Sequence, residues 1–283
     1  MVLIADSGST KTDWMLRGET ATRQFHTQGI NPIHQSDEQI LDILRGELLP
    51  QLISLNQLSA IKFYGSGVRP DQEARMERLL REVFQLHSSH PSPLTPHPQI
   101  EAHSDLLGAA RALCGDSEGL ACILGTGANS CLYDGEKIVA NTPPLGYILG
   151  DEGSGAVLGK RFLNALYKGQ LSNETKSDFE AEMRMTLTEV IERVYRQSLP
   201  NRWLASLSPF IHSRLDDPAV EALVVDNFSD FIARNIEPYH RRDLPLQAVG
   251  SIAFYYRDQL SQAANKVGYA VGKILRSPLD GML

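Results

Sequence analysis

The chain has 283 residues, of which 42% are hydrophobic and 22% charged, and this composition is typical of a soluble globular protein. It excludes a wholly disordered chain, and the length fits one large domain or two modest ones. The formal net charge is −7 and no block of Lys and Arg occurs, so we expect no nucleic-acid partner. Nine of the 22 glycines lie between Gly119 and Gly159, which predicts sharp turns or close ligand approach in that stretch.

The termini and cysteines indicate a cytoplasmic protein without a membrane segment. The apolar run at residues 1–5 is too short for a signal peptide, and no run approaches the ~18 apolar residues of a membrane helix. The three cysteines, Cys114, Cys122 and Cys131, are odd in number and lack C-x-x-C spacing. We therefore expect reduced thiols rather than a disulfide framework, a zinc site or an iron–sulfur cluster held by one chain.

The hydrophobic patterns of the first half predict strands followed by helices. We expect strands at 2–5, 13–16 and 21–27, a helix at 36–55 capped by Ser36, a strand at 61–64, a helix at 71–86 and an extended proline-rich segment at 91–98.

The second half repeats this order, which predicts an α/β protein with two halves and a boundary after Cys114. We expect a helix from Ser104-Asp105, strands at 119–124, 128–133 and 137–140, a helix from 159 to 168, helices at 174–197 and 218–236, a strand at 247–249, and helices at 252–266 and 268–276.

The segment from Asp6 to Thr12 connects the first two strands and carries phosphate-binding chemistry. Gly8 permits a turn, the hydroxyls of Ser9, Thr10 and Thr12 can donate to phosphate oxygens, and Lys11 adds a positive charge. Asp6 could hold Mg²⁺ directly or through water. The alternative is an ordinary polar hairpin turn, since no Walker A sequence is present.

A second loop, Gly125-Thr126-Gly127, also leaves an apolar strand, and its glycines would let the backbone press against a phosphate; the alternative is a tight hairpin. Further on, Asp151 and Glu152 stand among four glycines. Asp151 could bind a sugar hydroxyl or a metal, or both acids could complement the N-terminus of the following helix.

Two further positions carry a functional and a structural interpretation. Asp105, at a predicted helix start, could be a general base for a hydroxyl that attacks phosphate, or a simple N-cap. Gly250-Ser251 lies between a strand and a helix, where it suits packing against adenine or ribose, although many α/β proteins contain such turns.

Together these segments resemble the acetate kinase, sugar kinase, Hsp70 and actin ATPase superfamily. Within it the chain is similar to the BadF/BadG/BcrA/BcrD ATPase family, and to its N-acetylglucosamine kinase branch in particular. The resemblance spans nearly the whole chain and is carried, in order, by D6-SGSTKTDW-14, G29-INP-32, S104-DLLGAA-110, L124-GTGANS-130, G146-YILGDEGSGAVLGK-160 and V249-GSIA-253.

The resemblance implies a two-domain actin-like ATPase fold, which is ribonuclease H-like, with mixed sheets and flanking helices around an ATP cleft. The domains would be 1–114, completed by a C-terminal helix at 268–283, and 115–267. ATP would lie between the two phosphate loops, with Gly250-Ser251 beside the adenosine. The implied roles are Asp105 as catalytic base, Asp6 as the Mg²⁺ organiser, and Asn31, Asn129, Asp151 and Asp105 as amino-sugar ligands.

The function expected from this pattern is ATP-dependent phosphorylation of an amino sugar, N-acetylglucosamine to its 6-phosphate. In the better-known branch a Gly-Trp pair precedes the glycine matching Gly146; here it is Pro144-Leu145, which leaves the N-acetyl preference open. The alternatives are an ATPase activator subunit of a dehydratase or reductase, which needs cysteines at a subunit axis, and a non-catalytic sugar or nucleotide sensor. A homodimer is possible through the helical stretches at 174–236.

Overall fold

The computed structural model describes residues 1–8, 10–19, 21–52, 57–86 and 98–282. The chain forms two compact units, Met1–Gly108 with Pro278–Leu283, and Ala109–Ser277. The division falls within a helix rather than after Cys114. Ser9 and the proline-rich segment up to residue 97 lie outside the described residues.

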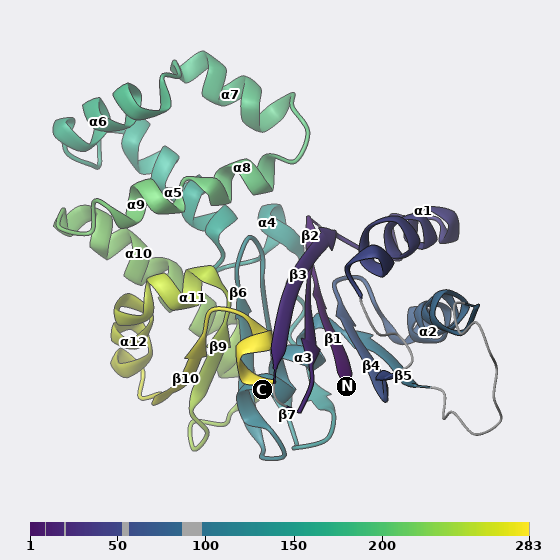
Figure 1. The fold of residues 1–283 in the computed structure, drawn as a ribbon. Coiled ribbons are helices and arrows are strands. Elements are labelled where there is room, and N and C mark those ends of the chain that lie inside the picture. The colour runs from purple at the N-terminus through teal and green to yellow at the C-terminus, as the bar shows by residue number, and fades with distance from the viewer. Residues whose placement is uncertain (9, 20, 53–56, 87–97, 283) are drawn as a thin grey trace. The chain divides into compact units, whose positions relative to one another are not determined.

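The first unit is built on a five-stranded mixed sheet with the order β3-β2-β1-β4-β5. Strands β1, β2 and β3 are antiparallel, whereas β1, β4 and β5 run parallel. Its elements are β1 (Val2–Ser7), β2 (Lys11–Arg17), β3 (Thr22–Gln28), α1 (Asp37–Ile43), β4 (Ala60–Gly65), α2 (Pro70–Leu86) and β5 (Gln99–Ser104), followed by α3 (Asp105–Cys114) (Figure 1).

Helices α1 and α2 pack beside each other and bury one apolar face of this sheet. Ser36 caps α1 through a capping box with Gln39, as its position predicts. Within the predicted helix at 36–55, α1 ends at Ile43, and π-helical Leu44–Leu48 and 3₁₀-helical Leu49–Gln51 follow it. Residues 53–55 of that prediction lie outside the described residues.

The second unit repeats the sheet pattern with the order β10-β9-β6-β7-β8. Its elements are β6 (Gly119–Leu124), β7 (Ala128–Tyr133), β8 (Ile138–Ala140), α4 (Gly146–Leu149), α5 (Gly155–Tyr167), α6 (Asn173–Met183), α7 (Leu187–Tyr195), α8 (Pro200–Ser206), α9 (Ser208–His212), α10 (Pro218–Phe231), β9 (Leu246–Val249), α11 (Ser251–Tyr255), α12 (Arg257–Lys266) and β10 (Val271–Leu275). The hydrophobic pattern of the sequence did not predict helices α8 and α9.

The predicted helix at 268–276 is wrong. Residues 271–275 form β10, which pairs in parallel with β9 in the second unit, and a Cβ at Gly272 would meet Gln247 at 2.9 Å. The C-terminal helix at 268–283 therefore does not exist; only the segment from Pro278 joins the first unit, where Leu279 packs with Ile4, Met15 and Tyr64. Val271, Ile274 and Leu275 have the i, i+3, i+4 spacing of a helix, but pairing with β9 overrides this local pattern.

Two other predicted helices are interrupted. Arg184, at φ 50°, ends α6, and a Thr186–Glu189 capping box starts α7, so the pattern at 174–197 is two helices. Tyr256 separates α11 from α12. The expected helix at 218–236 is continuous, with a π-helical end from Ile232.

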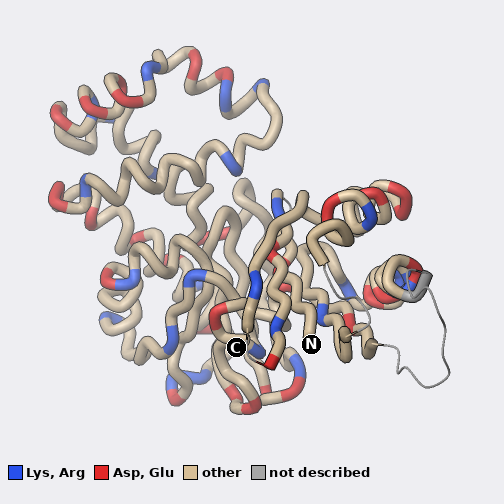
Figure 2. Tube along the Cα trace, viewed as in Figure 1, with Lys and Arg blue, Asp and Glu red and all other residues tan. Residues whose placement is uncertain are grey.

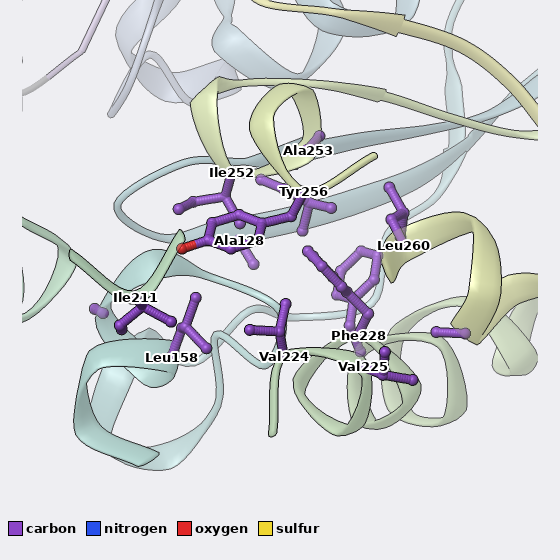
Figure 3. Packing of buried hydrophobic residues seen from close by; sticks show 14 of the residues in the cluster. Ala128, Leu158, Ile211, Val224, Val225, Phe228, Ile252, Ala253, Tyr256 and Leu260 are labelled. Atoms are coloured by element: carbon purple, nitrogen blue, oxygen red, sulfur yellow. The ribbon is translucent and has the colours of Figure 1, made fainter. Parts of the chain in front are cut away.

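The core of the second unit lies where α5, α10, α11 and α12 meet the sheet. Figure 3 shows Ile252, Ala253 and Tyr256 facing Phe228 and Leu260 in this cluster. On the exterior, Lys and Arg positions are interspersed with Asp and Glu along α6 and α7 (Figure 2). No helix in the described part of the chain is long and apolar enough to span a bilayer.

Candidate functional site

The parallel strands of the first unit bring two aspartates to one edge of the sheet. The final residues of β1, β4 and β5 are in register, with Ser7 beside Gly65 and Gly65 beside Ser104. Asp6 is the penultimate residue of β1, and Asp105 follows β5 directly. Carboxyl edges of parallel strands are where α/β folds bind their ligands.

Asp6 is partly buried, and its pKa is raised to about 7. Burial is the largest cause, the negative charges of Asp105 and Asp13 add to it, and the Lys11 cation acts in the opposite direction. This edge therefore carries more negative charge than its own lysine compensates, and a bound cation would be stabilised there.

Asp105 is not the N-cap of α3, because Ser104 has that role and accepts a hydrogen bond from the Leu107 N–H at 3.2 Å. Asp105 Oδ1 accepts from the Leu106 N–H at 2.9 Å. Burial raises the pKa of Asp105 despite this hydrogen bond. Helix α3 lies close to β4, since a Cβ at Gly108 would meet the Tyr64 ring at 2.7 Å. The carboxylate is thus held by a tightly packed helix and is well suited to accept a proton.

The β1–β2 turn exposes part of the predicted phosphate loop. The Gly8 N–H donates to the Lys11 carbonyl at 3.0 Å, and Gly8, Thr10 and Lys11 are exposed. Lys11 Nζ lies 2.9 Å from Asp13 Oδ2. Thr12 does not fit the expected set of phosphate-binding hydroxyls, because it is fully buried and its hydroxyl donates to the Gln28 carbonyl at 3.1 Å. That hydroxyl holds the hairpin together and has no proton left for a phosphate.

Asn31 lies in the loop after β3 and is 8% exposed. Its Oδ1 accepts from the Ile33 N–H at 3.0 Å, and a Cβ at Gly67 would lie 2.2 Å from the same oxygen. Gly67 follows β4, so Asn31 is next to the strand edge that carries Asp6. Only glycine fits at position 67, because its φ is +83° and the amide fills the space of a side chain.

In the second unit, the loop Gly125-Thr126-Gly127 closes a tight turn between β6 and β7, with the Gly125 N–H donating to the Gly127 carbonyl at 3.0 Å. The start of α5 is bound to this turn, since the Gly155 N–H donates to the Gly125 carbonyl at 2.8 Å. Gly250 lies on the same turn: a Cβ there would be 2.3 Å from the Leu124 carbonyl oxygen. The structure therefore brings Gly125, Thr126, Gly127, Gly250 and Ser251 together at the carboxyl edge of β6 and β9.

Asp151 adds a carboxylate to this edge. It has φ +53°, which is rare for a non-glycine residue, and a Cβ at Gly127 would lie 3.1 Å from its Oδ2. Burial raises its pKa to about 6, while hydrogen bonds from the Ala128 and Gly146 backbone N–H groups act to lower it. The left-handed conformation of Asp151 places its carboxylate against the glycine turn.

Asn129 belongs to a polar network that the sequence does not reveal. Its Oδ1 accepts from Asn141 Nδ2 at 2.9 Å, and Asn141 also donates to the Ser130 carbonyl at 2.7 Å. Tyr239 extends the network, because its hydroxyl lies 2.8 Å from Ser130 Oγ. These partners are up to 109 residues apart in the chain, and no spacing pattern could have found them.

The cysteines lie in the second unit, where Cys122 and Cys131 are buried and Cys114 is partly buried. Burial raises the pKa of Cys114 to about 11 and that of Cys131 to about 12. Metal ligation and nucleophilic chemistry require thiolates, so these positions suit packing. In the described residues, no group of three or more His, Cys, Asp or Glu side chains is arranged to hold a metal ion.

The two units have the same sheet pattern, in which antiparallel strands lie beside parallel ones. Each unit also has acidic residues and glycine turns at the carboxyl edge of its sheet. This combination defines an actin-like ATPase fold. A crystal structure of a proposed N-acetylglucosamine kinase from Porphyromonas gingivalis is similar with a TM-score of 0.92 and 48% identity, over 100% of this chain and 97% of that one.

Two more distant structures share the fold alone. A proposed N-acetylglucosamine kinase from Chromobacterium violaceum matches with a TM-score of 0.70 and 18% identity, over 99% of this chain and 96% of that one. A ROK family glucokinase from Streptomyces griseus, in complex with glucose and AMPPNP, matches with a TM-score of 0.58 and 13% identity, over 99% and 95%.

The similarity to the Porphyromonas protein places the chain in its family, and the chain belongs to the sugar kinases of the actin-like ATPase fold. No protein-family model and no curated protein matches the chain, so membership of the BadF/BadG/BcrA/BcrD family stays a prediction.

Proposed function

We propose that the protein is an ATP-dependent kinase of amino sugars, which phosphorylates N-acetylglucosamine on its 6-hydroxyl in the cytoplasm. The 48% identical relative is a proposed N-acetylglucosamine kinase, and the glucokinase of the same fold was crystallised with glucose and an ATP analogue. The observation that carries the proposal is the Asp105 carboxylate, which has a raised pKa and lies at the same strand edge as Asp6.

In the proposed reaction, Asp105 accepts the proton of the sugar 6-hydroxyl as its oxygen attacks the γ-phosphorus of ATP. A new oxygen–phosphorus bond forms, the bond to the β,γ-bridging oxygen breaks, and ADP leaves. The raised pKa makes Asp105 a stronger base than an exposed aspartate, which favours transfer of the hydroxyl proton to its carboxylate.

We assign phosphate binding to the two glycine turns. Gly8, Thr10 and Lys11 are exposed at the first, and Gly125, Thr126 and Gly127 form the second, while Gly250 and Ser251 would border the adenosine. Ser9 is proposed for the first set on its sequence position. Asn31, Asn129 and Asp151 would bind sugar hydroxyls or the acetamido group together with Asp105.

Asp6 fits the role of the Mg²⁺ residue. Its carboxylate is in a negative field from Asp105 and Asp13, which a divalent cation would compensate. Mg²⁺ is commonly held by one or two carboxylates plus substrate phosphates, so a large protein ligand set is not required. When bound with ATP, Mg²⁺ neutralises charge on the phosphates.

The proposal is tested by coupled ADP release over a panel of N-acetylglucosamine, glucosamine, N-acetylmannosamine and an N-acetylmuramic acid derivative. We expect N-acetylglucosamine to give the highest kcat/KM, and Asp105→Asn to lower kcat by about 10² or more with little effect on the sugar KM. Asp42→Asn, an exposed aspartate on α1, is the control and should keep full activity. No sugar-stimulated ADP release, or an undiminished Asp105→Asn variant, would reject the proposal.

A further inference from the structure

Strand β10 brings an arginine to the carboxyl edge of the second sheet. β10 runs parallel to β9, and its last residue, Leu275, accepts a hydrogen bond from the Gly250 N–H at 3.0 Å. Arg276 is the next residue along the chain. It therefore lies beside the Gly250-Ser251 turn, at the edge where β6 ends in the glycine loop.

Helix α11, which follows this turn, has a buried side and an exposed side. Ile252, Ala253 and Tyr256 face the core (Figure 3), whereas Tyr255 is 49% exposed. Ser251 and Tyr255 are the first and last residues of α11, about 6 Å apart along its axis. A large exposed aromatic ring thus lies within a nucleoside's length of the turn proposed to border adenosine.

The Arg276 guanidinium lies over the Tyr255 ring, with 5.9 Å between Cζ and the ring centroid. The ring is further fixed by Phe254, at 5.5 Å and 88°, and by His212, at 6.2 Å and 73°, both of which contact it edge-on. In the described part of the chain, Arg276 forms no ion pair with a carboxylate. The Arg276 guanidinium is therefore positioned by an aromatic ring and has no carboxylate partner among the described residues.

We propose that Arg276 and Tyr255 form the base-stacking platform of the nucleotide site, on which the adenine ring lies against the guanidinium plane while Tyr255 supports that plane from the other side. The inference rests on the proposed use of ATP. Planar guanidinium groups stack on aromatic systems, whereas the ammonium of lysine offers charge without a plane. The platform contributes positioning of the nucleoside, and the phosphates are bound by the glycine turns.

Adenosine, which lacks phosphates, is the probe for this platform, and tripolyphosphate is the probe for the phosphate turns. Binding of each is measured by titration calorimetry on the full chain. Arg276→Ala and Arg276→Lys should both weaken adenosine binding at least about fivefold, because neither residue offers a plane, and both should leave tripolyphosphate binding unchanged. Tyr255→Phe should behave as wild type, and Tyr255→Ala should resemble Arg276→Ala.

Arg257→Ala is the matched control, since Arg257 also lies over an aromatic ring, Phe254, at 4.9 Å but belongs to α12. It should leave adenosine binding unchanged. Unchanged adenosine binding in Arg276→Ala, recovery of adenosine binding by lysine, or no adenosine binding to the wild-type chain would overturn the platform. If adenosine binding follows the expected pattern but the chain shows no sugar-stimulated ADP release, the proposed kinase function is contradicted and the platform is not.

Discussion

Replacing Asp6 by Asn should make the first unit more stable, and increasingly so as the pH rises. The folded chain raises the pKa of Asp6 to about 7 from an ordinary 3.8. A raised carboxyl pKa means that the folded state favours the protonated form, so the contribution of Asp6 to stability is fully present below about pH 3.8 and is lost as the pH rises through about 7. Asparagine cannot ionise and does not incur this loss.

The magnitude follows from the two pKa values. Each pH unit between the two pKa values contributes about 1.4 kcal/mol. The free energy of unfolding of Asp6→Asn minus that of the wild type should therefore be larger at pH 7.5 than at pH 4, by up to about 4 kcal/mol. The same substitution should abolish Mg²⁺-dependent activity, because the carboxylate is lost. A substitution that stabilises the fold but removes activity is the result expected if Asp6 has the proposed role.

Urea unfolding without divalent cations measures this difference. Trp14 lies in the core of the first unit and Trp203 lies in the second, so a Trp203→Phe background makes Trp14 emission specific for the first unit. Asp37→Asn is the control of opposite sign, because Arg78 and Arg75 lower the pKa of Asp37 and its removal should cost stability at neutral pH. A stability difference for Asp6→Asn that stays flat or shrinks as the pH rises would refute the reasoning.

The remaining predictions concern the glycine turn and the thiols. Gly250→Ala should destabilise the second unit by about 3 kcal/mol in urea unfolding, because φ is +117° and the new Cβ would be 2.3 Å from the Leu124 carbonyl oxygen. Gly125→Ala, whose Cβ meets nothing within 4 Å, should change stability by less than about 1 kcal/mol, and equal effects would contradict the packing argument. The native chain should react with a thiol reagent slowly and only at Cys114, and rapid labelling of Cys122 or Cys131 before unfolding would contradict their burial.

The sequence predicted most strands and the turns that follow them, because these depend on local rules. Short apolar runs bounded by turn residues locate β1, β2, β6 and β7, and a turn glycine or an acid after a strand is visible in the residues themselves. The strand β10 and the buried Thr12 hydroxyl were not predictable in this way. The apolar spacing at 271–275 is that of a helix, and the Thr12 hydroxyl is bound by the Gln28 carbonyl of the neighbouring strand. The position of Arg276 at the carboxyl edge of the second sheet was not predictable either, because it requires residues 271–275 to form a strand.

Pairing predicts proximity in a sheet, but not which side-chain group retains hydrogen-bonding capacity. Asp105 follows β5 and Thr12 lies near the start of β2, at the same edge of the sheet. Ser104 caps α3, which leaves the Asp105 carboxylate free of that role. The Thr12 hydroxyl, in contrast, donates its proton to the Gln28 carbonyl. Such differences depend on how neighbouring polar groups are satisfied, which is a property of the folded arrangement.

The discontinuity of the first unit has a consequence for biosynthesis. The chain leaves this unit at Gly108 and returns only at Pro278, so Leu279, which packs with Ile4, Met15 and Tyr64, is translated after the whole second unit. While the ribosome makes residues 109–277, that apolar cluster on β1 lacks Leu279. The nascent first unit therefore exposes apolar surface for the time needed to translate the second, and a chaperone that recognises apolar segments would have its substrate there.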